Sequence, residues 1–251
     1  MAAGLRRPRT YVARAANRFG VRGRQPERSP QQSSIPDDGP SLDYLFIVTY
    51  GRSGSTLLQG LLASIPGYLI RGENGGAVFH LYRFHTRVAA ARKDQGPGAE
   101  PTSPWYGIGG YPEATAYQEI RRLILTTLIR PEPDSRVVGF KEIRWRQGDL
   151  GDYVSFLRKV FPGARFIVNT REHQEVARSK WWAKRPDALP AIAKAEGEML
   201  ALVELLGADF FHLHYNDYVD EPQRLRALFD WLSAEFDETR VATVMSRKHG
   251  Y

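Results

Sequence analysis

The sequence, 251 residues long, contains no cysteine. Disulfide bonds, thiolate metal sites and a cysteine nucleophile are therefore excluded. Long apolar runs are missing as well: the longest, at 44–48 and 123–129, are far shorter than the roughly 18 residues that a membrane-spanning helix needs. We therefore expect a chain without a transmembrane segment, and we expect it in the cytoplasm.

Lysine and acidic residues are scarce in the first 40 residues, which hold eight arginines, no lysine, three acids and five prolines. This segment carries +5 of the formal net charge of +7. We expect a disordered basic tail at 1–40 and one folded domain at 41–251. Because the charge is concentrated in the tail, we expect no nucleic-acid partner. Contact of the tail with an anionic membrane surface stays open, as does a role as a transit peptide.

Apolar segments alternate with amphipathic ones along the rest of the chain. The expected strands are 43–49, 68–70, 136–143, 165–169 and 209–214, and the expected helices are 55–64, 77–92, 113–130, 149–160, 172–184, 188–206, 221–236 and 238–245. This alternation predicts an α/β fold: a P-loop-like three-layer sandwich with a central parallel sheet flanked by helices. Ligands of such sheets bind beyond the carboxyl ends of the strands, where we expect Arg52, Glu73 and Arg171.

The first strand runs into the turn Gly51-Arg52-Ser53-Gly54 and then into a helix that begins with Ser55-Thr56. Such a turn directs backbone N–H groups and the positive end of a helix dipole at one point, where a phosphate or sulfate group binds. A nucleoside triphosphatase loop has a lysine between its last glycine and the following Ser or Thr, and here that lysine is missing. No strand ends in an aspartate suited to magnesium, so the sequence favours neither magnesium-dependent phosphoryl transfer nor any other metal site.

A second candidate anion site follows the strand at 165–169. Arg171 comes directly after this strand, and Ser179 lies eight residues further on, two turns into the expected helix at 172–184. The arginine fork and the hydroxyl could bind another anion beside the first loop. The alternative is a salt bridge for Arg171 and a surface position for Ser179.

Together the two segments resemble those of the sulfotransferase superfamily that uses the donor 3′-phosphoadenosine 5′-phosphosulfate (PAPS). Members carry a loop Arg/Lys-Ser-Gly-Ser/Thr-Ser/Thr that binds the 5′-phosphosulfate, and the residues from Arg52 to Thr56 match it at each position. They also carry an arginine with a serine eight residues later for the 3′-phosphate, which Arg171 and Ser179 match. The resemblance is closest to the tyrosylprotein and bacterial carbohydrate or lipid branch. It implies a sulfotransferase whose nucleotide product is 3′-phosphoadenosine 5′-phosphate (PAP).

The resemblance also implies residue roles. Arg52 would stabilise the charge that grows on the bridging oxygen. Glu73, which follows Arg52 by 21 residues, would be the general base that accepts the proton of the acceptor hydroxyl. Lys141 at a strand end, and Arg247 and Lys248 near the C-terminus, are further candidates for contacts with donor or acceptor.

Several alternatives stay open at this point. His80 or His85, on the helix after Glu73, could replace it as the base. The expected acceptor is a hydroxyl of a carbohydrate, glycolipid or related metabolite, held by the helix at 77–92 and the loop at 93–112. A P-loop small-molecule kinase and a catalytically silent binding module of the same fold are the alternative functions. The sequence does not indicate the oligomeric state.

Overall fold

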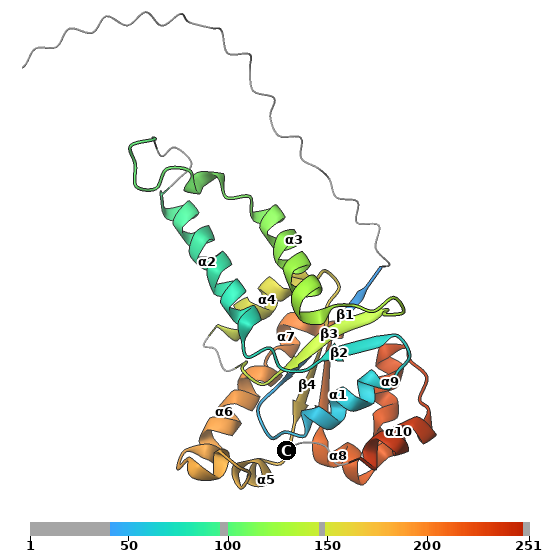
Figure 1. Ribbon diagram of the computed structural model, residues 1–251. Coiled ribbons are helices and arrows are strands. Elements are labelled where there is room, and N and C mark those ends of the chain that lie inside the picture. Colours follow the sequence, from blue (N-terminus) through green and yellow to red (C-terminus); the bar gives the residue numbers. More distant parts are fainter. Residues whose placement is uncertain (1–40, 96–99, 146–148, 248–251) are drawn as a thin grey trace, which may run out of the picture. The chain divides into compact units, whose positions relative to one another are not determined.

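The computed structural model describes residues 41–95, 100–145 and 149–247. The basic tail expected at 1–40 and the candidate Lys248 lie outside these residues. The described residues contain one parallel sheet with the strand order β2-β3-β1-β4-β5 (Figure 1). Its strands are β1 (Asp43–Thr49), β2 (Tyr68–Arg71), β3 (Val137–Glu142), β4 (Arg165–Thr170) and β5 (Phe210–His214).

Strand β1 lies at the centre of the sheet and separates two apolar cores. Phe46 and Val48 contribute to one core, whereas Leu45 and Ile47 contribute to the other, because successive side chains of a strand point to opposite faces. All four side chains are fully buried. Both faces of the sheet are therefore covered, as the near-continuous apolar run of β1 predicts.

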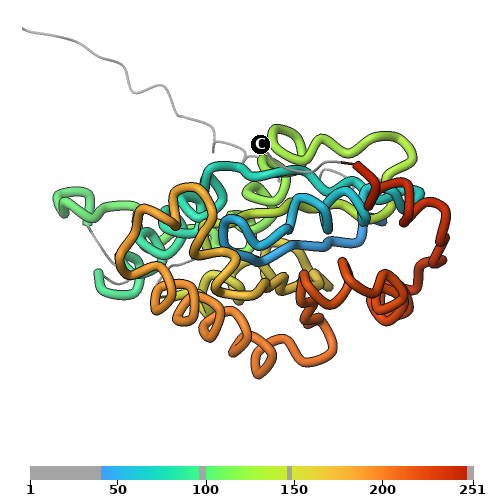
Figure 2. Tube along the Cα trace, turned by 90° about the horizontal axis from the view of Figure 1, so that it is seen from below, coloured from blue at the N-terminus to red at the C-terminus, as the bar shows by residue number. Residues whose placement is uncertain are grey.

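Helices form the outer layers of the sandwich. They are α1 (Ser55–Ala63), α2 (Ala77–Gln95), α3 (Glu113–Ile124), α4 (Leu150–Val160), α5 (His173–Ala177), α6 (Ala188–Leu200), α7 (Val203–Leu206), α8 (Tyr215–Asp220), α9 (Leu225–Leu232) and α10 (Glu238–Met245). Helices α1, α8, α9 and α10 supply buried residues to one core, and α2 to α7 supply the other. Figure 2 shows this division from below, with the red C-terminal helices apart from the orange α6. The expected α/β sandwich is confirmed.

Several expected helices are divided or shifted. The segment 113–130 is α3 followed by a π-helical turn, and 188–206 is two helices, α6 and α7. The segment 172–184 contains only the five-residue α5 and a 3-10 turn at Trp182–Lys184. Lys180 between them has a φ of 45°, a left-handed conformation that no helix continues. Ser179 therefore lies in a turn and not inside a helix.

Two further helix boundaries differ from expectation. Helix α2 extends to Gln95, and the segment 221–236 begins with a 3-10 turn at Pro222–Arg224 before α9. Helix α8, directly after β5, was not expected from the sequence. Of the described helices, none combines the length and the apolar character needed to cross a membrane.

Candidate functional site

The loop after β1 turns sharply before α1 begins. Arg52 and Gly54 both have left-handed backbone conformations, with φ values of 74° and 80°. A Cβ atom on Gly54 would come within 2.0 Å of the Tyr215 ring, so this position requires glycine for its conformation and for its lack of a side chain. Since the first-turn N–H groups of a helix have no intrahelical partners, the start of α1 directs N–H donors at this turn, an arrangement that favours an anion.

Ser53 has a structural place within this loop. Its hydroxyl is buried and lies 2.6 Å from the hydroxyl of Thr49, which in turn donates to the carbonyl of Asn169 at 2.7 Å. The side-chain amide of Asn169 donates to the Ser53 carbonyl at 2.9 Å. These bonds attach the loop to the end of β4, the neighbouring strand, and leave the Ser53 hydroxyl facing the interior.

A cavity of about 250 Å³, the small cavity, opens beside this loop at the carboxyl edge of the sheet. It brings together most of the predicted site residues. Those that line it are Gly51, Arg52, Gly54, Ser55, Thr56, Glu73, Lys141, Arg171 and Arg247. The two segments that were expected to bind anions thus meet at one place, because β4 lies next to β1. Ser53 and Ser179 are not among the lining residues.

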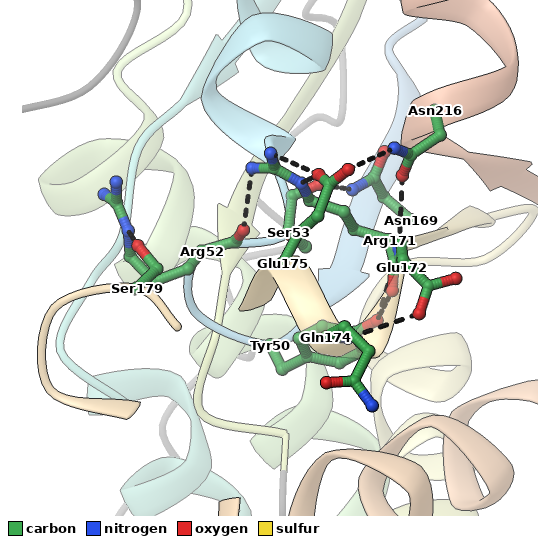
Figure 3. A network of polar contacts seen from close by, with 10 residues as sticks. All are labelled: Tyr50, Arg52, Ser53, Asn169, Arg171, Glu172, Gln174, Glu175, Ser179 and Asn216. Atoms are coloured by element: carbon green, nitrogen blue, oxygen red, sulfur yellow. Dashed lines mark hydrogen bonds and ion pairs between the residues drawn. The ribbon is translucent and has the colours of Figure 1, made fainter. Parts of the chain in front are cut away.

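The side chains of Arg52 and Arg171 are oriented by neighbours in this cavity (Figure 3). Arg52 donates through Nε to the Ser179 hydroxyl at 2.9 Å. Arg171 donates through Nε and Nη2 to one carboxylate oxygen of Glu175, at 2.9 and 2.7 Å, and its guanidinium lies 4.4 Å from the centre of the Tyr215 ring. The hydrogen bond from Arg171 lowers the pKa of Glu175, so this carboxylate is ionised at neutral pH.

Tyr50, the residue before the loop, connects it to β4 and α6. Its hydroxyl lies 2.6 Å from a carboxylate oxygen of Glu196 and accepts the backbone N–H of Arg171 at 2.9 Å. Burial, together with the Glu196 carboxylate, raises the pKa of Tyr50, so the phenol stays protonated and can donate to Glu196. The start of the Arg171 segment is thereby held against the loop.

Glu73 lies in the loop after β2 and forms an ion pair with Lys141 at the end of β3. The Lys141 Nζ is 2.6 Å from a carboxylate oxygen of Glu73. The lysine side chain is 7% exposed and that of Glu73 is 39% exposed. The cation is therefore buried below the carboxylate, which is open to solvent and to a ligand.

A second cavity of about 910 Å³, the large cavity, adjoins the first. Glu73, Gly51, Ile143 and Trp181 line both. The other residues of the large cavity come from the start of the loop after β3, the segment 182–185 and α6: they are Arg144, Trp182, Arg185, Ala191, Lys194, Ala195 and Glu198. Glu73 thus lies at the boundary between the two cavities.

The expected contribution of 77–92 and 93–112 to an acceptor pocket is not observed among the described residues. None of them in α2 or in 100–112 lines either cavity. Helix α2 buries Val78, Tyr82 and His85 in the core that it shares with α3 and α4. Its apolar side is thus used for packing within the fold.

The alternative bases lie away from the two cavities. His85 is buried, with its Nδ1 2.9 Å from the Tyr111 hydroxyl and its ring against Tyr117 and Phe156. Burial lowers the pKa of His85. His80 is exposed on α2, and neither histidine lines a cavity.

Three residues at the site were missed by reasoning from the sequence: Tyr215, Glu196 and Glu142. Tyr215 packs over Gly54, and Glu196 lies far along the chain from its partner Tyr50. Glu142 is a buried carboxylate at the end of β3. For Glu142 a signal was available, because a charged residue inside an apolar strand needs hydrogen-bonding partners when it is buried.

The sequence profile of a family described as "Sulfotransferase family" matches residues 44–238, which include β1 to β5 and both cavities up to the start of α10. The chain belongs to this family. The matched range of this sulfotransferase includes the loop at 50–56, Glu73, Lys141 and Arg171. Arg247 lies beyond that range. No curated protein matches the sequence.

Solved structures similar to this sulfotransferase include three proteins of the same named activity. The sulfotransferase domain from the Synechococcus PCC 7002 olefin synthase is 19% identical, with a TM-score of 0.49 over 84% of this chain and 80% of that one. The sulfotransferase domain from the curacin biosynthetic pathway is 15% identical, with a TM-score of 0.49 and the same coverage of 84% and 80%. Sulfotransferase STF9 from Mycobacterium avium is 16% identical, with a TM-score of 0.45 over 82% of this chain and 68% of that one.

Proposed function

We propose that this sulfotransferase moves a sulfuryl group from PAPS to a hydroxyl of a carbohydrate, glycolipid or related metabolite. One observation carries the choice of donor. Arg52, Lys141, Arg171 and Arg247 come from four separate segments and line the same small cavity, together with the start of α1. A nucleotide with anionic groups on both the 3′ and the 5′ side of its ribose requires two separate anion sites in one cavity, and the cations from four segments of this cavity support that assignment.

The two anion sites differ in chemistry. At the first, backbone N–H groups and the hydroxyls of Ser55 and Thr56 suit the 5′-phosphosulfate. At the second, the guanidinium of Arg171 suits the 3′-phosphate, since a planar fork binds phosphate oxygens through two parallel hydrogen bonds. The Ser179 hydroxyl, which was expected beside Arg171, accepts from Arg52 Nε at 2.9 Å and does not line the small cavity.

The residues at the boundary of the cavities support in-line transfer with a protein base. Sulfuryl transfer needs positioned reactants and a cation for the charge that develops on the leaving oxygen, and we assign that role to Arg52, which lines the small cavity. The acceptor hydroxyl must lose its proton on the opposite side. Glu73 lines both the small and the large cavity, so its carboxylate can accept this proton from a hydroxyl that enters through the large one.

Nucleotide binding tests the donor. PAP should raise the thermal unfolding temperature strongly, while adenosine monophosphate, which lacks the 3′-phosphate, should raise it much less. Equal stabilisation by the two nucleotides would refute the role of Arg171 and Ser179.

Transfer of radiolabelled sulfate from PAPS into a lysate of the source organism, followed by identification of the labelled product, tests the reaction and the acceptor class. Glu73→Gln should reduce the incorporation to a low, still measurable rate without loss of PAP binding. PAP binding without label transfer to any acceptor of a broad panel would favour a catalytically silent module.

A further inference from the structure

Glu142 is a buried carboxylate that lies beside the site but lines neither cavity. It is the last residue of β3, directly after Lys141, and is 4% exposed. One of its oxygens accepts the backbone N–H groups of Asn74 and Gly76 at 3.2 and 3.0 Å. The other accepts those of Ile143 and Arg144 at 2.8 and 3.1 Å. Its carboxylate therefore binds four backbone N–H groups.

These four N–H groups belong to two loops that form the walls of the cavities. Asn74 and Gly76 follow the candidate base Glu73, and Ile143 and Arg144 line the large cavity. The two loops are also joined directly, because Arg144 donates through Nη1 to the carbonyl of Gly75 at 2.7 Å. Glu142 thus holds the loop after β2 against the loop after β3.

The backbone of the Glu73 loop is shaped for this contact. Gly75 and Gly76 have φ values of 69° and 82°, a conformation that glycine adopts at little cost and that turns successive N–H groups toward one anion. A carboxylate suits this position because it only accepts hydrogen bonds and has about four acceptor sites on its two oxygens. An amide has one accepting oxygen and would place its NH₂ group against two N–H donors.

We propose that Glu142 is a positioning residue for the base of this sulfotransferase. Lys141 and Glu142, successive residues of β3, hold Glu73 in two ways. Lys141 binds its side chain at 2.6 Å, and Glu142 binds the backbone that follows it. Glu142 acts through Glu73 and touches no reactant, so this inference rests on the proposed function and on Glu73 as the base.

A double-mutant cycle separates a positioning role from a purely structural one. We expect Glu142→Gln to lower kcat by about 10- to 100-fold, as small misplacements of a catalytic group do. The KM for PAPS and the affinity for PAP should stay within about twofold of the values for the unsubstituted protein, because Glu142 does not touch the nucleotide. In a Glu73→Gln background the same change should cost nothing further, since no base remains to be positioned.

Hydrogen–deuterium exchange tests the contact without any acceptor. In Glu142→Gln, the amides of residues 74 and 76 should exchange faster than in the unsubstituted protein. Asp209→Asn is the matched control: it removes a carboxylate that binds Arg158 at 3.0 Å in the turn before β5, and it should change neither exchange at 74–76 nor kcat.

Two sets of results would overturn the inference, and two others would overturn its basis. Unchanged exchange at residues 74–76 in Glu142→Gln would refute the contact. Equal loss of kcat in both backgrounds, or loss of PAP affinity, would show a general structural role and refute positioning. Full activity of Glu73→Gln would show that Glu73 is not the base. Failure of PAP to raise the unfolding temperature of the unsubstituted protein would refute the proposed donor. The exchange result would still decide whether Glu142 holds the Glu73 loop.

Discussion

The small and the large cavity share an edge but are built differently. In the small cavity, of about 250 Å³, three cations have a partner within the protein: Arg52 binds Ser179, Lys141 binds Glu73, and Arg171 binds Glu175. The large cavity, of about 910 Å³, has walls that mix indole rings and alanines with charges of both signs. Strand ends and a tight loop form the walls of the small cavity, whereas one face of α6 forms part of the wall of the large cavity.

Under the proposed function, in which the small cavity binds the donor and the large cavity the acceptor, this difference indicates how each ligand is selected. A phosphate or sulfate group is recognised by a few fixed donors, so the small cavity depends on backbone conformation at positions such as Gly54. An acceptor is selected by shape and side-chain chemistry, which α6 can vary without disturbing the sheet. Three of the four substitutions below test this division, and the fourth changes a residue outside both cavities; they run from the largest expected effect to the smallest.

Replacing Arg52, the cation proposed to stabilise the leaving oxygen, should have the largest effect on the rate. Arg52→Ala should lower kcat by about 10²- to 10³-fold, the cost of losing one donor to a developing oxyanion. Steady-state rates with radiolabelled PAPS measure this. Arg130→Ala is the matched control, because Arg130 also has a positive φ, of 52°, and lines neither cavity. Similar losses in both variants would assign the effect to backbone strain.

Removing the second anion site should affect one nucleotide only. Arg171→Gln should weaken PAP binding about 10- to 100-fold, since a hydrogen bond to a charged group contributes about 1.5–3 kcal/mol. The affinity for adenosine monophosphate should change little, and calorimetry compares the two. Glu175→Gln, which releases Arg171 from its ionised partner, should not weaken PAP binding. A loss that is equal for both nucleotides would contradict the assignment.

Filling the large cavity should separate acceptor from donor. Ala191→Phe places a ring in the cavity and should raise the acceptor KM about tenfold, the size expected from an overpacking cost of about 1–3 kcal/mol. The affinity for PAP should be unchanged. Ala193→Phe is made on an exposed position of the same helix that lines neither cavity, and should leave both constants as they are. Weaker PAP binding in Ala191→Phe would show that the two cavities are not independent.

The smallest expected effect concerns stability and lies outside both cavities. Burial lowers the pKa of His85 below its ordinary value of 6.5, with Glu113 raising it and Lys159 lowering it further. The stabilisation that this neutral histidine provides is complete above the unfolded-state pKa and is lost as pH falls through the folded-state pKa. The unfolding temperature should therefore fall as the pH is lowered through the ordinary histidine pKa of 6.5, and less steeply in His85→Phe.

His212, whose pKa is also lowered by burial, should preserve part of this slope in His85→Phe. Identical slopes with and without His85 would show that it makes no contribution. Catalysis should not follow the same titration, because neither histidine lines a cavity.

The strands were predicted to within one residue at each end, because a strand buried on both faces is a short apolar run bounded by polar residues. The turn from Arg52 to Thr56 was predicted for a similar reason, since its conformation depends on consecutive residues. The helix expected at 172–184 was wrong because the positive φ of Lys180 ends the helical path, and lysine gives no local signal for that conformation. The acceptor pocket was expected at 77–92 and 93–112, but the apolar side of α2 is used in the core and none of residues 100–112 lines either cavity.

Local patterns were sufficient for the family, the parallel sheet and the tight turn between β1 and α1, because each depends on periodicity or on the backbone of a few neighbouring residues. The order of strands in the sheet was needed for the rest. It places β3 next to β2, and so brings Lys141 within 2.6 Å of Glu73 across 68 residues of chain. The four bonds of Glu142 and the wall that α6 gives to the large cavity have the same origin: contacts between distant segments follow from packing, which no short stretch of sequence encodes.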